Sequence, residues 1–176
     1  MNQNAKNYVG LVLGTFGVAG SVLEIGALDY NGNVNELFAD KTRFPEHIHI
    51  DGTAGPNVDA VMYADDLKYD DRRFGCVLAL DMLEHDLTPW LSMREFHRVL
   101  VNGGHLLLST CAFGFPMHMR GCDYWRFSIE GIERLLAYGG FSIIDLRENN
   151  ENQLFALAQK NQGNISKWQK IKSWLG

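Results

Sequence analysis

Hydrophobic residues along the chain group into short runs that alternate with segments of helical spacing. The runs have the length of strands, and each is rich in aliphatic or β-branched side chains. They predict seven strands, at residues 21–27, 47–51, 58–63, 74–81, 105–110, 141–146 and 153–159.

Helical spacing of apolar residues predicts helices between the strands. One covers residues 89–101, with Thr88 as N-cap and the glycines after residue 102 as its stop. Another covers 129–138, and Ser128 caps it. Two further helices are predicted, at residues 4–18 and, as a short one, 34–38. Strands that alternate with helices predict an α/β fold with a mostly parallel sheet covered on both faces.

Composition and charge narrow the class of protein. The 176 residues fit one domain and carry a net charge of −5. Residues 1–88 contain 14 acidic and 6 basic residues, net −8, whereas residues 89–176 contain 7 and 10, net +3. A chain with this excess of acidic residues lacks the basic surface that a general nucleic-acid binder needs. Its three cysteines form no close pair, which is typical of a reducing compartment.

Both ends of the chain need separate treatment. Residues 7–23 carry no charge, but four glycines dilute the apolar run, so we expect a packed helix rather than a signal peptide or membrane span. A cytoplasmic location follows as an expectation. Residues 160–176 contain four lysines and no acid. We expect them to form a basic C-terminal helix or tail that follows a domain at residues 1–159. We expect this helix to dock on the domain, with a membrane or partner contact as the alternative.

Chemistry-bearing residues follow the ends of the first four predicted strands. Gly26 closes the first strand, Asp51 the second, residues 65–67 follow the third, and Asp81 with Met82 ends the fourth. In an open α/β sheet, ligands bind at the carboxyl ends of the strands, and an acid after the second strand suits a ribose diol. Glycine-rich phosphate-binding motifs are absent from the sequence, as are the nucleophile-elbow and H-E-x-x-H motifs. The expected ligand is therefore a nucleoside without phosphates.

Several segments together resemble one family, the class I S-adenosylmethionine-dependent methyltransferases. VLEIGA resembles the family's first motif, and HIHIDG its second-strand segment with a terminal acid. ADDLKYDDRRFGCVLALDMLEH resembles the stretch that ends in L-E-H, and REFHRVLVNGGHLLLST the R-x-L-x-P-G-G segment. The later HMRGCDYWRF resembles a subgroup with H…DYWR. The resemblance covers residues 21–159 and implies a Rossmann-like, doubly wound, seven-stranded sheet with some helices reduced to loops.

The resemblance also implies S-adenosyl-L-methionine as cofactor and no metal. It implies that Glu24 and Gly26 shape the pocket for the methionine part of the cofactor, and that Asp81 lies near the sulfonium. It also implies that Asp51 accepts from the ribose hydroxyls and Asp66 from the adenine amino group. The full set of implied cofactor contacts, with Asp65 as a second candidate beside Asp66, is Glu24, Gly26, Ala27, Asp51, Gly52, Asp65, Asp66, Leu67, Asp81 and Met82.

Catalytic candidates follow the fourth and fifth strands. His85, His118 and Tyr124 stand where a base for an acceptor hydroxyl is expected, because a histidine titrates near neutral pH. Arg126 suits either an anionic substrate group or an internal ion pair. The remaining four histidines lack ligand spacing and are predicted to be structural: His47, His49, His97 and His105.

The expected activity is methyl transfer to an oxygen or nitrogen atom of a small polar metabolite, with a sugar as one candidate. GALDYNG replaces the G-x-G of the first motif, and Gly75 stands in place of the acid of F-D. These departures keep a non-catalytic binding module open, and a protein or nucleic-acid methyltransferase is the other alternative. A small-molecule acceptor is the expected partner, and a homo-oligomer stays open.

Overall fold

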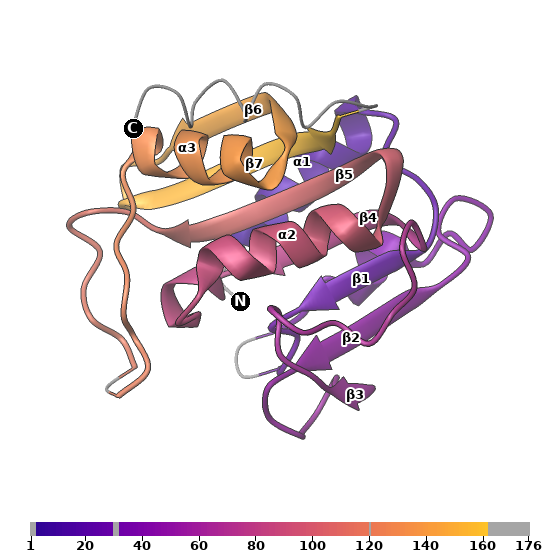
Figure 1. Cartoon of the computed structure of the whole chain (residues 1–176), viewed down its shortest axis with the longest axis horizontal. Helices are drawn as coiled ribbons and strands as arrows, with labels where there is room; N and C mark the ends of the chain where they lie inside the picture. The colour runs from indigo at the N-terminus through magenta and orange to yellow at the C-terminus, as the bar shows by residue number, and fades with distance from the viewer. Residues whose placement is uncertain (1–2, 30–31, 120, 162–176) are drawn as a thin grey trace, which may run out of the picture.

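A computed structural model of the chain describes residues 3–29, 32–119 and 121–161. In this part of the chain seven strands form one sheet, in the order β3-β2-β1-β4-β5-β7-β6 (Figure 1). The first five strands pair in parallel, and β7 runs antiparallel to both β5 and β6. Their bounds are β1 Val22–Ile25, β2 His47–Asp51, β3 Ala60–Val61, β4 Phe74–Leu80, β5 Leu100–Cys111, β6 Phe141–Glu148 and β7 Gln153–Lys160.

Helices cover both faces of this sheet. Figure 1 shows α2 and α3 in front of the sheet and α1 behind it. The bounds are α1 Gln3–Thr15, α2 Pro89–Val99 and α3 Ile129–Gly139, with the 3-10 helices η1 Asn35–Phe38 and η2 Leu83–His85. The predicted fold class is confirmed: a seven-stranded, mostly parallel, Rossmann-like sheet with helices on both faces. The connections from β2 to β3 and from β3 to β4 are loops, as the resemblance implied.

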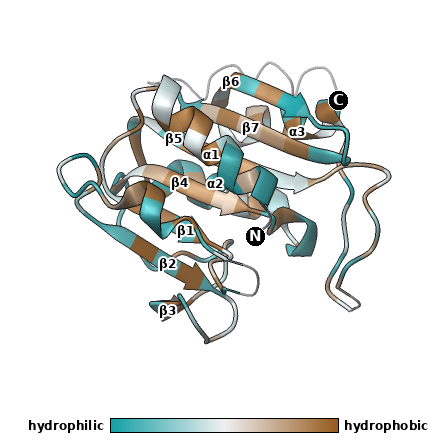
Figure 2. Ribbon diagram, turned by 180° about the vertical axis from the view of Figure 1, so that it is seen from behind, coloured by the Kyte–Doolittle hydropathy of each residue, from teal (hydrophilic) through white to brown (hydrophobic). Residues whose placement is uncertain are grey.

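Alternate side chains of the central strands pack into two separate hydrophobic cores, one on each face of the sheet. Leu23 and Ile25 belong to the core under α2 and α3, whereas Val22 belongs to the core under α1. Figure 2 shows the central strands largely in the colour of apolar residues, because both of their faces are covered. Across the described residues, no helix combines the length and the apolar character that crossing a bilayer requires.

The predicted start of α3 is confirmed, whereas α2 ends two residues earlier than predicted. Ser128 caps α3 as predicted, since its hydroxyl accepts from the Gly131 N–H at 3.0 Å. The predicted helix over 89–101 ends at Val99 instead, because Leu100 pairs with Phe74 and opens β5. The predicted capping by Thr88 is wrong in detail: its hydroxyl makes no cap bond and donates to Asp65 at 2.8 Å.

Other element lengths differ in ways that pairing explains. The strand expected at 58–63 shrinks to two residues, because β3 pairs with β2 only at Ala60 and Val61. At the far edge, β7 extends to Lys160, whose ammonium is buried and donates to the Leu100 carbonyl at 2.8 Å. The rest of the predicted C-terminal helix, residues 162–176, lies outside the described residues.

Two glycines provide a matched test of this fold. Gly26 has φ +77°, and a Cβ there would lie 2.7 Å from the Cβ of Met82. Gly10 lies inside α1, and a Cβ there would meet nothing within 4 Å. We expect Gly26→Ala to lower the free energy of unfolding by about 1–3 kcal/mol through backbone strain. Gly10→Ala should raise it by about 0.5–1 kcal/mol because alanine is the better helix former.

Urea unfolding of the two variants and the parent measures both changes. Equal changes of the same sign would contradict the close approach of β1 and β4 at their carboxyl ends.

Candidate functional site

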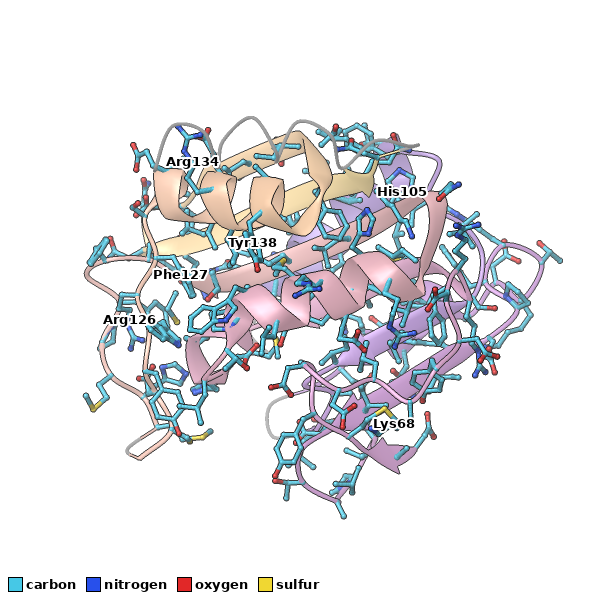
Figure 3. The ribbon with its side chains drawn as sticks, in the orientation of Figure 1. Lys68, His105, Arg126, Phe127, Arg134 and Tyr138 are labelled. Atoms are coloured by element: carbon cyan, nitrogen blue, oxygen red, sulfur yellow. The ribbon has the colours of Figure 1, made fainter. Side chains whose placement is uncertain are left out.

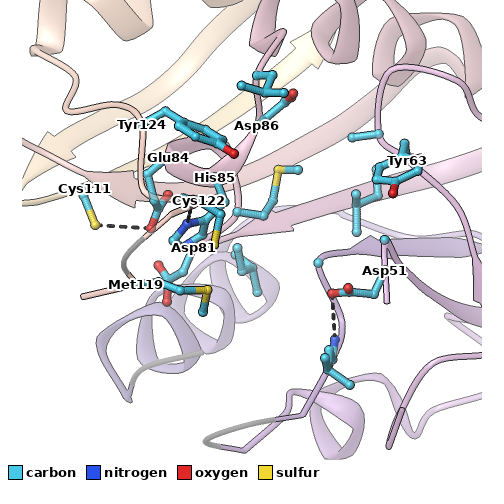
Figure 4. Close-up of a pocket in the computed structure, with 18 of the residues that line it drawn as sticks. Asp51, Tyr63, Asp81, Glu84, His85, Asp86, Cys111, Met119, Cys122 and Tyr124 are labelled. Atoms are coloured by element: carbon cyan, nitrogen blue, oxygen red, sulfur yellow. Dashed lines mark hydrogen bonds between the residues drawn. The ribbon is translucent and has the colours of Figure 1, made fainter. Parts of the chain in front are cut away.

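A cavity of about 1070 Å³ opens at the carboxyl ends of β1, β2 and β4. Figure 4 shows Asp51 and Tyr63 on one side of it and Asp81, His85 and Tyr124 on the other. This is the edge where an open α/β sheet binds its ligands. The sequence-predicted residues that line it are Gly26, Asp51, Gly52, Asp65, Asp81, Met82, His85, His118 and Tyr124.

A tight approach of β1 and β4 forms the floor of the cavity. The positive φ of Gly26 turns the chain toward Met82, and any side chain at position 26 would occupy the space of the Met82 side chain. Asp81 also has a positive φ, +51°, which is unfavourable for a residue with a Cβ. Ser109 supports that conformation, since its hydroxyl donates to the Asp81 carboxylate at 2.6 Å. Backbone strain of this kind is concentrated at functional sites.

Asp51 at the end of β2 holds the loop after β1. Its carboxylate accepts from the Leu28 N–H at 3.3 Å and from the Thr53 N–H at 2.9 Å (Figure 4). An ionised carboxylate has about four acceptor positions. Two of them are therefore still available to hydroxyl donors in the cavity.

Four of the implied cofactor contacts do not line the cavity. Glu24 is buried on the other face of the sheet, where it accepts from His47. Ala27 is buried. Asp66 is exposed and paired with Lys68, and the Leu67 N–H is taken by the carboxylate of Glu95 at 3.0 Å.

Asp65, the second candidate at this place, does line the cavity. It accepts from the Thr88 hydroxyl, which ties the end of β3 to the start of α2. Gly52 also lines the cavity, and a Cβ at that position would lie 3.0 Å from the ring of Tyr63. The cavity at this end is therefore flanked by an acid and an exposed tyrosine.

At the opposite end of the cavity two histidines face each other. The Nε2 atoms of His85 and His118 are 3.0 Å apart. The Nδ1 of His85 contacts the Cys122 carbonyl, an acceptor, so that nitrogen carries the proton and the Nε2 of His85 has the free lone pair. A neutral His118 carries one proton, so either its Nε2 donates to His85 or its Nδ1 donates to Asp123, which lies 3.4 Å away. Tyr124 flanks the pair with its backbone N–H bonded to the Glu84 carbonyl at 2.8 Å.

An ion pair shapes the loop that presents His118. Arg126 donates to both oxygens of Asp123, whose side chain is only 1% exposed. The Arg126 guanidinium holds the pKa of the Asp123 carboxyl well below its usual range. It also donates to the carbonyls of Phe115 and Pro116, at 2.9 Å each, and Figure 3 places it inside this loop. Arg126 thus forms the internal ion pair rather than offering a free cation to a substrate.

Two acids in the lining were not singled out from the sequence. Glu84 is fully buried and accepts from the Thr110 hydroxyl at 2.7 Å and the Cys111 thiol at 3.2 Å. Burial raises the pKa of the Asp86 carboxyl, although bonds from Ser92 and Thr88 partly oppose that. The L-E-H motif contained Glu84, but only the fold shows that its carboxylate turns inward.

Comparison with known proteins agrees with this geometry. Residues 12–108 match the family described as methyltransferase domain. No curated protein matches the chain. Among solved structures, a Burkholderia thailandensis 1,6-didemethyltoxoflavin-N1-methyltransferase with bound S-adenosylhomocysteine superposes with TM-score 0.71 at 17% identity, covering 91% of this chain and 78% of that one.

Two further solved structures share the fold. A Mesorhizobium loti S-adenosylmethionine-dependent methyltransferase has TM-score 0.68 at 14% identity, covering 88% of this chain and 98% of its own. The [4+2]-cyclase SpnF has TM-score 0.71 at 17% identity, covering 92% and 82%. At such identities the likeness establishes the fold alone.

The Arg126–Asp123 ion pair yields a stability prediction. Arg126→Gln leaves the buried Asp123 carboxylate without its cation, so we expect a loss of about 3 kcal/mol, localised in the 112–127 loop. Limited proteolysis should then cleave this loop faster than in the parent. Arg147→Gln, which removes an exposed pair with Asp145, is the control and should change little. Equal cleavage rates in both variants would show that Arg126 does not hold the loop.

Proposed function

Because the chain belongs to the methyltransferase domain family, whose enzymes use S-adenosyl-L-methionine, we propose that it methylates an oxygen or nitrogen atom of a small polar metabolite. A sugar is one candidate. The observation that carries this proposal is one cavity lined both by Asp51 and Asp81 at the strand ends and by the His85–His118 pair. Its volume of about 1070 Å³ lies at the upper end of the ~300–1,000 Å³ usual for ligand pockets, which is enough for a nucleoside cofactor.

The residues at the strand ends fit the cofactor. The space above Gly26 is a cradle that a side chain would fill, and Asp51 keeps acceptor positions for a ribose diol. For the adenine amino group we propose Asp65 in place of Asp66, because Asp65 lines the cavity and Asp66 points to solvent. Met82 supplies an apolar face for the ring. When bound, S-adenosyl-L-methionine supplies an electrophilic methyl group on a sulfonium centre.

The histidine pair suits the acceptor side. A hydroxyl acceptor must lose its proton as the new bond forms, and a base within hydrogen-bond reach provides for that. We assign this role to the Nε2 of His118, which has a free lone pair when Nδ1 donates to Asp123, with His85 and Tyr124 beside it. Asp123 faces the Nδ1 of His118 and would stabilise the positive charge that the pair gains.

Three alternatives remain as outcomes of experiment. The fold similarity to a [4+2]-cyclase supports the view that this scaffold also serves chemistry other than methyl transfer. A binding module without catalytic activity is likewise an alternative. Of the macromolecular acceptors, nucleic acid is disfavoured by the net charge of −5, and a protein acceptor stays an alternative.

Asp51 gives the prediction for cofactor binding. Asp51→Ala removes charge-assisted hydrogen bonds, so we expect S-adenosylhomocysteine to bind more weakly by about 1–3 kcal/mol in calorimetry. The matched control is Asp66→Ala, because Asp66 is a nearby acid that does not line the cavity, and its binding should equal that of the parent. A loss with Asp66→Ala but not with Asp51→Ala would overturn the assignment.

His118 gives the prediction for catalysis. In a screen of sugars and other polar hydroxyl acceptors, His118→Gln should lower kcat by about 10²–10⁴-fold while S-adenosylhomocysteine binds as in the parent, since a general base acts on the chemical step. His105→Gln is the control, because His105 lies on β5 outside the cavity lining (Figure 3). Cofactor binding without turnover on any acceptor would favour the non-catalytic alternative.

A further inference from the structure

We propose that Glu24, His47, His49 and Asn35 form a binding site for a divalent transition-metal ion of the zinc type. None of the four lines the cofactor cavity. They lie on the face of the sheet that packs toward α1, where η1 is the one helical element described between β1 and β2. The sequence predicted both histidines to be structural, but residues two apart on a strand share one face.

Three strand side chains converge at this place. The Nε2 of His47 lies 2.9 Å from the Oε2 of Glu24, and the Nε2 of His49 lies 4.0 Å from the same oxygen. The rings of the two histidines have centroids 4.1 Å apart. All three side chains are largely buried, with 6%, 5% and 13% of their surface exposed for Glu24, His47 and His49. Their ligand atoms all lie within 4.8 Å of one another.

Asn35 of η1 adds a fourth donor, and its orientation is fixed. Its Nδ2 donates to the Oδ1 of Asn57 at 2.7 Å, and the Nδ2 of Asn57 donates to the Ala27 carbonyl at 3.0 Å. A carbonyl only accepts, so this chain of bonds has one direction. The Oδ1 of Asn35 therefore faces the Nε2 of His49, at 3.0 Å.

His49 is consequently placed between oxygen atoms on both sides. Its Nδ1 lies 2.9 Å from the carboxylate of Asp59, and its Nε2 faces Asn35 and Glu24. A neutral imidazole carries one proton and can satisfy only one of these sides. With the ring's proton on Nδ1 toward Asp59, a metal ion at Nε2 would satisfy the side that faces Asn35 and Glu24.

The donor set and its spacing favour the metal ion. Two imidazoles with a carboxylate suit zinc, and the Asn35 oxygen can fill the fourth position. Tetrahedral ligands ~2.0–2.1 Å from zinc stand about 3.3 Å from one another. The separations of 2.9, 3.0 and 4.0 Å bracket that value. Asp59 holds the Nδ1 of His49, which is the contact that orients metal-binding histidines elsewhere. An ion here ties β1, β2 and η1 together.

Titration with metal tests the site directly. The chain is prepared without a histidine tag, stripped with a chelator, and titrated with Zn²⁺ by calorimetry and with Co²⁺ by visible absorption. We expect one equivalent of either metal to bind, and the Co²⁺ spectrum to show the intense bands of a tetrahedral ion. Zn²⁺ should also raise the melting temperature, since it binds only the folded chain.

Variants then locate the ion. Asp59→Asn keeps an oxygen that can accept from the backbone N–H of His49, and the side chain of Asp59 is exposed. The variant should therefore fold. It should weaken Zn²⁺ binding about 10–100-fold. His49→Gln should weaken it by more than that, since it removes a ligand, and circular dichroism checks its fold.

A second cluster in the chain provides the matched control. Glu84, His85 and His118 also bring ligand atoms within 4.8 Å of one another. The double variant His85→Gln/His118→Gln should bind Zn²⁺ as the parent does. Loss of binding in that variant would assign the ion to the cavity and overturn the proposal. Absence of Zn²⁺ binding in the parent would also overturn it.

Discussion

The pairing of β1 with β2 on one side and β4 on the other is the constraint on which the site depends. Ile25 stands opposite Ile50 of β2 and Ala79 of β4, and all three are buried. Because the three strands run in parallel and in this register, the residues that follow them emerge at one edge. Gly26 completes the arrangement, since its N–H bonds to the Ile50 carbonyl at 3.0 Å and its missing side chain leaves room for Met82.

The same strands explain why Glu24 is absent from the cavity. Successive side chains of a strand point to opposite faces, so Ile25 lines the cavity and Glu24 faces the other side of the sheet. A buried carboxylate without partners is costly, and His47 offsets that cost with a bond of 2.9 Å. One strand of four residues therefore contributes an apolar wall to one site and an acid to a polar cluster.

Local patterns predicted the parts of the structure that local physics decides. The existence and order of the seven strands, the Ser128 cap and the positions of Asp51 and Asp81 at the ends of their strands depend on nearby residues, and the structure has them as expected. The end of α2 was not predictable in this way. Leu100 has a helical pattern behind it, but its pairing with Phe74, 26 positions earlier in the chain, draws it into β5.

The choice between adjacent acids shows the same limit within the site. Asp65 and Asp66 are equivalent in sequence, and only one of them can face the cavity. Glu95 takes the Leu67 N–H and Arg98 takes the Leu67 carbonyl, so α2 fixes the turn that follows β3. Asp65 then meets Thr88 beside the cavity, while Asp66 is left outside it. Contacts from residues about 30 positions away thus decide which carboxylate is available to a ligand, and no local motif encodes them.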